Sequence, residues 1–87
     1  MEETRILVVD DEQEIADLLE LYLISDGYQV IKSEDALEGL AIMEREKIDL
    51  VLLDIMMPKM DGLEMCRKIR EKHNVPIMHG QRQRHRS

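Results

Sequence analysis

Carboxylates placed directly after short apolar runs are the residues with the clearest chemistry in this chain. Asp10 and Asp11 follow the apolar run at residues 6–9, and Asp54 follows a second run at residues 50–53. Such short aliphatic runs are typical of buried strands. In an open sheet of parallel strands, ligands bind at the carboxyl ends of the strands. If these two strands are neighbours, the three carboxylates converge at one edge of the sheet.

Three carboxylates this close repel one another unless a cation neutralises them. A hard divalent cation with oxygen ligands fits best, and Mg²⁺ also keeps coordination positions for water and phosphate oxygens. The same ion would neutralise charge on a phosphoryl group that is being transferred to a carboxylate. The pattern therefore predicts a Mg²⁺-assisted phosphoacceptor site.

The simpler interpretation gives each acid a structural role. Asp10 and Asp11 could cap the helix that follows them, and Asp54 could end its strand at a turn. The combined spacing favours a site, because both apolar runs end in acids. In addition, a loop containing Pro58 and Gly62 follows Asp54 and can hold backbone groups near it.

The elements that must position these acids alternate between strand and helix. Strands are predicted at residues 6–9, 28–32 and 50–53, and a fourth begins at residue 75. Apolar residues at helical spacing predict helices between them, the second with Ser33 as its N-cap. The expected core faces of the three helices are Ile15, Leu18, Leu19, Tyr22 and Leu23; Ala36, Leu37, Leu40 and Ala41; and Leu63, Met65, Cys66 and Ile69. This alternation indicates an α/β fold, a parallel sheet with helices on its faces.

Bulk properties narrow the class of protein. At 87 residues the chain holds one small domain, and its net charge of -7 argues against binding to nucleic acid. No apolar run approaches the length needed to cross a membrane. The lone Cys66 cannot form an internal disulfide and, on a helix face, is expected to be a small core residue. A reducing, cytoplasmic setting is therefore expected.

Two segments carry a family resemblance. VVDDE at residues 8–12 and DIMMPKMDG at residues 54–62 resemble the receiver domains of response regulators in bacterial two-component systems. The resemblance runs from Arg5 to Met78. It is greatest to the OmpR/PhoB-type transcription regulators, with some likeness to the VanR-type branch. It implies a CheY-like (flavodoxin-like) doubly wound parallel sheet.

The resemblance also implies a function and a set of site residues. Asp54 would accept the phosphoryl group from a phosphohistidine on a sensor histidine kinase, so the domain is a phosphoacceptor rather than an enzyme. Asp11 and Asp54 would bind Mg²⁺ through their side chains, together with the backbone carbonyl of Met56. Asp10 would hold a metal-bound water, while Pro58 and Gly62 would shape the loop.

The end of the sequence departs from the family pattern. The family has a Ser or Thr after the fourth strand and a Lys after a fifth strand, whereas here His79 follows the fourth strand and no fifth strand is seen. Residues 79–87 are basic and contain no apolar residue. They could be a solvated chain end. They could also be a basic tail that binds nucleic acid, but they contain no aromatic residue on which bases could stack. Synonymous codons for them, read one base later, give Thr-Ala-Lys-Gly-Lys-Asp-Thr-Glu-Ala, a receiver-like continuation.

We therefore expect residues 1–78 to form a partial receiver domain and residues 79–87 to be a frameshift product. A truncated sheet would expose apolar surface and a strand edge, so a homodimer is expected. Two alternatives stay open. One is a fragment that keeps the acidic metal pocket but has lost signalling and is stabilised by oligomerisation. The other is a metal-dependent phosphohydrolase with an aspartate nucleophile, although such enzymes usually place two acids one residue apart after a single strand.

Overall fold

The computed structural model of the chain describes residues 3–53 and 62–79, and its strands and helices alternate as predicted. Their bounds are β1 (Arg5–Val9), α1 (Gln13–Ser25), β2 (Gln29–Ser33), α2 (Ala36–Arg45), β3 (Leu50–Leu53), α3 (Gly62–Lys72) and β4 (Ile77–His79). The predicted α/β class is therefore confirmed.

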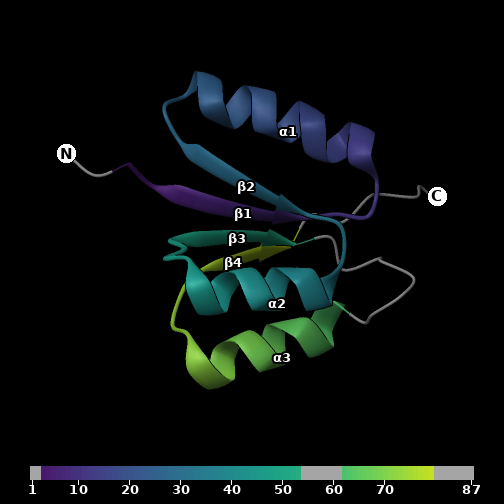
Figure 1. The fold of residues 1–87 in the computed structure, drawn as a ribbon, viewed down its shortest axis with the longest axis vertical. Coiled ribbons are helices and arrows are strands. Elements are labelled where there is room, and N and C mark those ends of the chain that lie inside the picture. Colours follow the sequence, from purple (N-terminus) through teal and green to yellow (C-terminus); the bar gives the residue numbers. More distant parts are fainter. Residues whose placement is uncertain (1–2, 54–61, 80–87) are drawn as a thin grey trace, which may run out of the picture.

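The strands form one parallel sheet in the order β2-β1-β3-β4. Helix α1 covers one face, and α2 and α3 cover the opposite face (Figure 1). β1 lies between β2 and β3, and its last residue, Val9, is in register with Ser33 of β2 and Leu53 of β3. The strands expected to be neighbours are therefore neighbours, and their carboxyl ends lie side by side.

The larger part of the core lies between the sheet and the pair α2 and α3. The buried residues of this cluster are Leu7, Val9, Ala36, Ile42, Met43, Ile48, Val51, Leu53, Met65 and Ile69. Gly39 lets α2 approach β1 and α3 closely, because a Cβ at this position would lie 2.9 Å from Met65 Cε and 3.2 Å from Val9 Cγ2. Cys66 packs against this cluster but is only partly buried, so it borders the core rather than belonging to its buried part.

The opposite face has a smaller cluster, made of Ile6, Val8 and Ala16. Leu19 and Leu23 of α1 pack against it, whereas Leu18 is 52% exposed and Tyr22 is 65% exposed. The expectation that Leu18 and Tyr22 face the core was wrong. The apolar residues of α1 extend around more of the helix than one sheet face can cover, so only part of them is buried.

The start of α2 also differs from the prediction. Asp35, not Ser33, is the N-cap, and its Oδ1 accepts a hydrogen bond from the backbone N–H of Glu38 at 2.8 Å. Ser33 is the last residue of β2, and its hydroxyl donates to the Asp35 carbonyl at 2.6 Å. The register of α2 consequently exposes Leu37 (74%). Ala36, Gly39, Ile42 and Met43 are buried instead.

Helix α1 ends at Ser25, with Asp26 as C-cap and Gly27 at a φ of +95°, a conformation that favours glycine. None of the helices in the described part of the chain is long and apolar enough to cross a membrane.

Candidate functional site

The carboxyl end of β1 delivers two adjacent acids in different environments. Asp10 is only 6% exposed, whereas Asp11 is exposed. The backbone N–H of Asp10 donates to the Ser33 carbonyl at 3.1 Å, and its Oδ1 accepts from the backbone N–H of Glu12 at 2.9 Å. These two bonds fix the corner between β1 and α1. Asp10 therefore has a local structural role at this corner. It is not the helix cap of the simpler interpretation, because the N-cap of α1 is Glu12 and no side chain makes a capping hydrogen bond there.

The carboxyl end of β3 lies next to this corner. Leu53 is in register with Val9, and neighbouring strands lie about 4.8 Å apart. Asp54 is the next residue in the sequence. Asp54, Met56 and Pro58 lie outside the described residues, so the convergence of Asp54 with Asp10 and Asp11 stays a prediction. Its premise, that β1 and β3 are neighbours, is confirmed.

Gly62, the last of the predicted loop residues, is the first residue of α3. Met65 and Ile69 of this helix are fully buried against the sheet. The loop that follows Asp54 therefore leads into a helix that the core holds in place.

Further acids lie on the β2–α2 connection and the first turn of α2, and β2 ends at the same edge of the sheet. Glu34 accepts from the Gln13 side chain at 2.6 Å, and Asp35 and Glu38 make capping hydrogen bonds. Within residues 3–53 and 62–79, no basic side chain forms an ion pair with Asp11, Glu34, Asp35 or Glu38. An edge with this charge attracts cations.

The donor set at this edge fits a hard cation, because carboxylate oxygens are the ligands that Mg²⁺ prefers. The residues that the structure describes include no group of three His, Cys, Asp or Glu side chains that could hold a metal ion. The predicted set needs Asp54 and the Met56 carbonyl, both outside the described ranges, to complete it. Asp10 and Asp11 are the members of that set whose backbone is described.

No residue type indicated in advance that the Ser33 carbonyl accepts a hydrogen bond from the Asp10 backbone N–H. A backbone acceptor has no residue-type signal, and the bond depends on β2 pairing beside β1 in the observed register. The hydrogen bond between Asp10 and Ser33 could therefore be identified only once the strand order was known.

Comparison with known proteins finds one family and many relatives. The family described as "Response regulator receiver domain" matches residues 6–82. Regulatory protein VanR from Enterococcus faecium is 53% identical over 74 residues, which is 85% of this chain and 32% of VanR. The chain thus spans about a third of the length of this curated relative.

Solved structures of receiver proteins share the fold. Chemotaxis protein CheY4 from Vibrio cholerae superposes with a TM-score of 0.86 at 28% identity, covering 90% of this chain and 68% of CheY4. Response regulator TrrA from Thermotoga maritima, in complex with Mg²⁺-BeF, gives a TM-score of 0.79 at 39% identity over 87% of this chain and 69% of TrrA. The complex of histidine kinase ThkA with TrrA gives 0.86 at 40% identity, covering 94% of this chain and 72% of the matched chain. The predicted CheY-like fold is confirmed.

Proposed function

Because the chain belongs to the family of response regulator receiver domains, we propose that Asp54 is the residue that accepts the phosphoryl group from a sensor histidine kinase. Members of this family are phosphoacceptors rather than classical enzymes. The observation that carries the proposal is the pairing of Val9 with Leu53, because an acid follows each of these neighbouring residues. The Asp54 carboxylate oxygen would form a bond to phosphorus while the bond from phosphorus to the histidine nitrogen breaks.

We propose Mg²⁺ as the cofactor of this reaction, bound by the side chains of Asp11 and Asp54 and by the backbone carbonyl of Met56. When bound, the ion would neutralise charge on the phosphoryl oxygens. Oδ1 of Asp10 is already engaged by the Glu12 N–H, which suits a carboxylate that reaches the metal through water. TrrA, a relative, was solved with Mg²⁺-BeF. Pro58, and Gly62 at the start of α3, are proposed to shape the connection between Asp54 and this helix.

A histidine kinase is the proposed partner, by analogy with the ThkA–TrrA complex. α1 offers a surface for it, because Leu18, Leu21 and Tyr22 are 52%, 68% and 65% exposed on a helix that starts just after the acids. Exposed apolar patches of this kind mark interaction sites. As VanR is a regulatory protein, we propose that the parent protein regulates transcription.

Several finer assignments stay predictions. They are the cytoplasmic location, the absence of direct nucleic-acid binding and the frameshift origin of residues 79–87. Self-association is proposed at the β4 edge of the described sheet, where Met78 is 56% exposed. Self-association could accompany the phosphoacceptor function. In the alternative in which the fragment has lost signalling, self-association would only stabilise the fragment.

The decisive experiment is intact-mass analysis after incubation with acetyl phosphate, with and without Mg²⁺. The wild-type chain should gain one phosphoryl group only when Mg²⁺ is present, and Asp54→Asn should gain none. Asp11→Asn should slow labelling by at least about tenfold, which corresponds to ~1.4 kcal/mol in the barrier. Asp26→Asn, at the far end of α1, is the matched control and should label like wild type. Equal labelling of wild type and Asp54→Asn would rule out Asp54 as the acceptor.

A further inference from the structure

Strand β2 forms one edge of the sheet, and its backbone bonding shows which of its polar groups point outward. The Gln29 N–H donates to the Thr4 carbonyl at 2.9 Å, and the Ser33 carbonyl accepts from the Asp10 N–H at 3.1 Å. Backbone groups alternate between the two sides of a strand. Gln29, Ile31 and Ser33 therefore bond toward β1, whereas Val30 and Lys32 direct their N–H and C=O groups outward. Within the described sheet, no strand lies beside β2 on that side.

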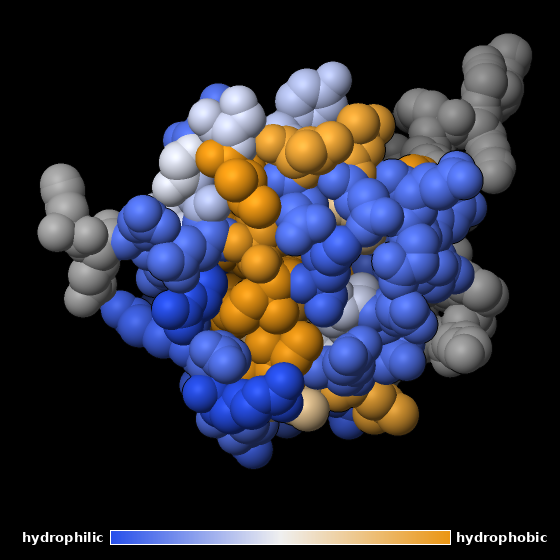
Figure 2. Space-filling view, turned by 45° about the horizontal axis from the view of Figure 1, so that its top comes forward, coloured by the Kyte–Doolittle hydropathy of each residue, from blue (hydrophilic) through white to orange (hydrophobic). Residues whose placement is uncertain are grey.

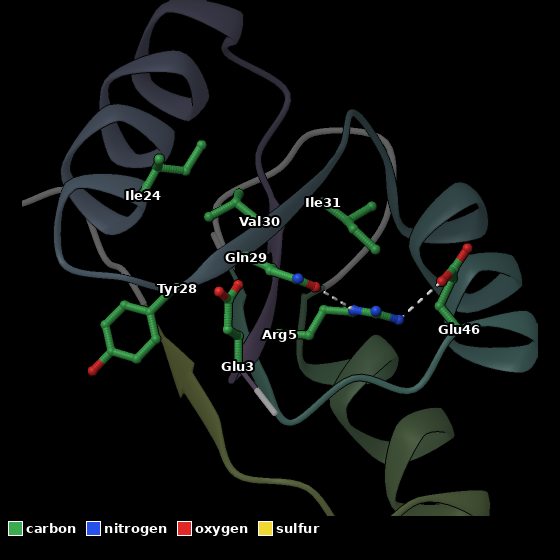
Figure 3. Close-up of a pocket in the computed structure, with 8 residues that line it drawn as sticks. All are labelled: Glu3, Arg5, Ile24, Tyr28, Gln29, Val30, Ile31 and Glu46. Carbon is green, nitrogen blue, oxygen red and sulfur yellow. Dashed lines mark hydrogen bonds and ion pairs between the residues drawn. The ribbon is translucent and has the colours of Figure 1, made fainter. Parts of the chain in front are cut away.

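A groove of about 540 Å³, lined by both apolar and charged residues, lies along this edge. Figure 3 shows Ile24 of α1 and Val30 of β2 on one side of the strand and Ile31 on the other side, toward α2. Ile24 is 53% exposed and Tyr28 is 38% exposed. Val30 packs against the cluster under α1 and Ile31 against the cluster under α2 and α3, so both sides of the edge are apolar. On the face seen in Figure 2, apolar side chains form a continuous band between charged regions.

The charged residues of the groove leave it with excess negative charge. The Arg5 guanidinium already donates to Gln29 Oε1 and to Glu46 Oε1, both at 3.1 Å (Figure 3). Glu3 lines the same groove and has no ion-pair partner among the described residues. The whole chain carries a net charge of -7. A basic partner is therefore favoured electrostatically.

A lysine on an edge strand usually discourages pairing with another chain. Lys32 is poorly placed to do so, because its Nζ lies 2.5 Å from Asp17 Oδ1 and 2.9 Å from Glu20 Oε1. Both acids belong to α1, so the Lys32 side chain is directed over the α1 face and its charge is balanced there. The outward backbone groups of Val30 and Lys32 remain available for pairing.

We propose that the β2 edge is a docking site for an extended, basic segment of another protein, which adds to the sheet as a strand beside β2. Its alternating apolar side chains would pack on Ile24 and Val30 on the α1 face, and a Lys or Arg at one end would pair with Glu3. The basic residues 79–87 fit poorly, because they include no apolar side chain. A second copy also fits poorly, because it brings another net charge of -7 and its own Lys32 is already paired. The β2 edge takes no part in phosphoryl transfer, so this proposal does not depend on the proposed function.

The test uses the ¹⁵N-labelled chain and the synthetic peptide acetyl-Lys-Lys-Val-Thr-Val-Thr-Val-amide. Peptide binding should shift the amide signals of Val30 and Lys32 and slow their hydrogen exchange. At a peptide concentration ten times Kd, exchange should be about tenfold slower. The Ile31 amide, which already bonds toward β1, should change little.

Two controls isolate the backbone pairing and two isolate the charge. Val30→Pro removes an outward N–H from an edge strand, a position where proline is tolerated, and should abolish binding while circular dichroism stays native. A peptide methylated at every backbone nitrogen should also fail to bind, and it requires no change in the protein. Glu3→Gln, or a peptide with Glu-Glu in place of Lys-Lys, should weaken binding at least threefold.

Three results would overturn the proposal. Equal binding of the Lys-Lys and Glu-Glu peptides would remove the electrostatic argument, and unchanged binding by the methylated peptide would remove the strand addition. Protection of the Val30 and Lys32 amides that grows with protein concentration, in the absence of peptide, would assign the edge to a second copy.

Discussion

Among the residues that the structure describes, ten buried residues form one cluster on the α2/α3 face of the sheet, whereas the cluster on the α1 face has three. The same strands supply both, because successive residues alternate between faces: Leu7 and Val9 lie in the larger cluster, and Ile6 and Val8 lie in the smaller one. The difference indicates that the described part of the chain draws most of its stability from one side of the sheet. The α1 side is less well packed, so its surface is available for binding a partner.

Asp10 and Asp11 lie at the carboxyl end of β1, a strand that contributes to both faces. Asp10 follows Val9, a fully buried residue of the larger cluster, and Leu53 holds the equivalent place before Asp54. The last residue of each strand is therefore anchored in the better packed half of the molecule. α1, with its exposed Leu18, Leu21 and Tyr22, starts from the same corner and covers the less packed half.

The largest expected effect is on the α2/α3 face. Ile69→Ala should lower the free energy of unfolding by about 3–4 kcal/mol, because Ile69 is fully buried and its packed neighbours cannot collapse into the cavity. Urea denaturation followed by circular dichroism measures this loss. Arg67→Ala on the exposed side of the same helix is the matched control and should change stability by no more than about 0.5 kcal/mol.

The same substitution on the α1 face should cost less. Ile6 is 1% exposed, but Leu19, Leu23 and Val30 around it are only partly buried and can move toward the space left by Ile6→Ala. We expect a loss of about 2 kcal/mol, at the lower end of the range for such changes. Denaturation under the same conditions as for Ile69→Ala compares the two faces directly. An equal or larger loss for Ile6→Ala would contradict the difference between them.

The sequence predicted the order of the strands and helices because buried parallel strands and amphipathic helices leave strong periodic patterns. It also predicted that Asp10 and Asp11 follow one strand and Asp54 another, and the structure supplies the adjacency of these two strands that the site requires. It did not predict which apolar residues of α1 and α2 are buried, because Leu18, Tyr22 and Leu37 fit the helical period as well as their buried neighbours do. That choice depends on how each helix is rotated against the sheet, and on close approaches such as that at Gly39.

The site itself was predicted only in outline. Residue types and strand ends suggested where acids gather, and strand order confirmed that the ends of β1 and β3 are adjacent. Which carboxylate accepts a hydrogen bond from a nearby backbone N–H depends on the local chain geometry. The Glu12 N–H that occupies Oδ1 of Asp10, and the Ser33 carbonyl that holds the Asp10 N–H, could not be read from residue types.

The smallest expected effect concerns Lys32, whose ion pairs tie β2 to α1 on the less packed face. Hydrogen bonds to Asp17 and then Glu20 raise the pKa of Lys32 above its ordinary value of 10.5. A raised pKa means that the folded chain holds this proton more tightly than the unfolded chain. The stabilisation is therefore complete below pH 10.5 and is lost as pH rises through the higher pKa of the folded state.

Lys32→Met should lower the urea concentration at the unfolding midpoint slightly at pH 8, and this gap in midpoint from wild type should close above pH 10.5. Because both partners are solvent-accessible, 0.5 M salt should also narrow the gap at pH 8. Urea denaturation of both chains between pH 8 and pH 11 measures this dependence, and a gap that stays constant across that interval would show that the charge of Lys32 does not stabilise the α1 face.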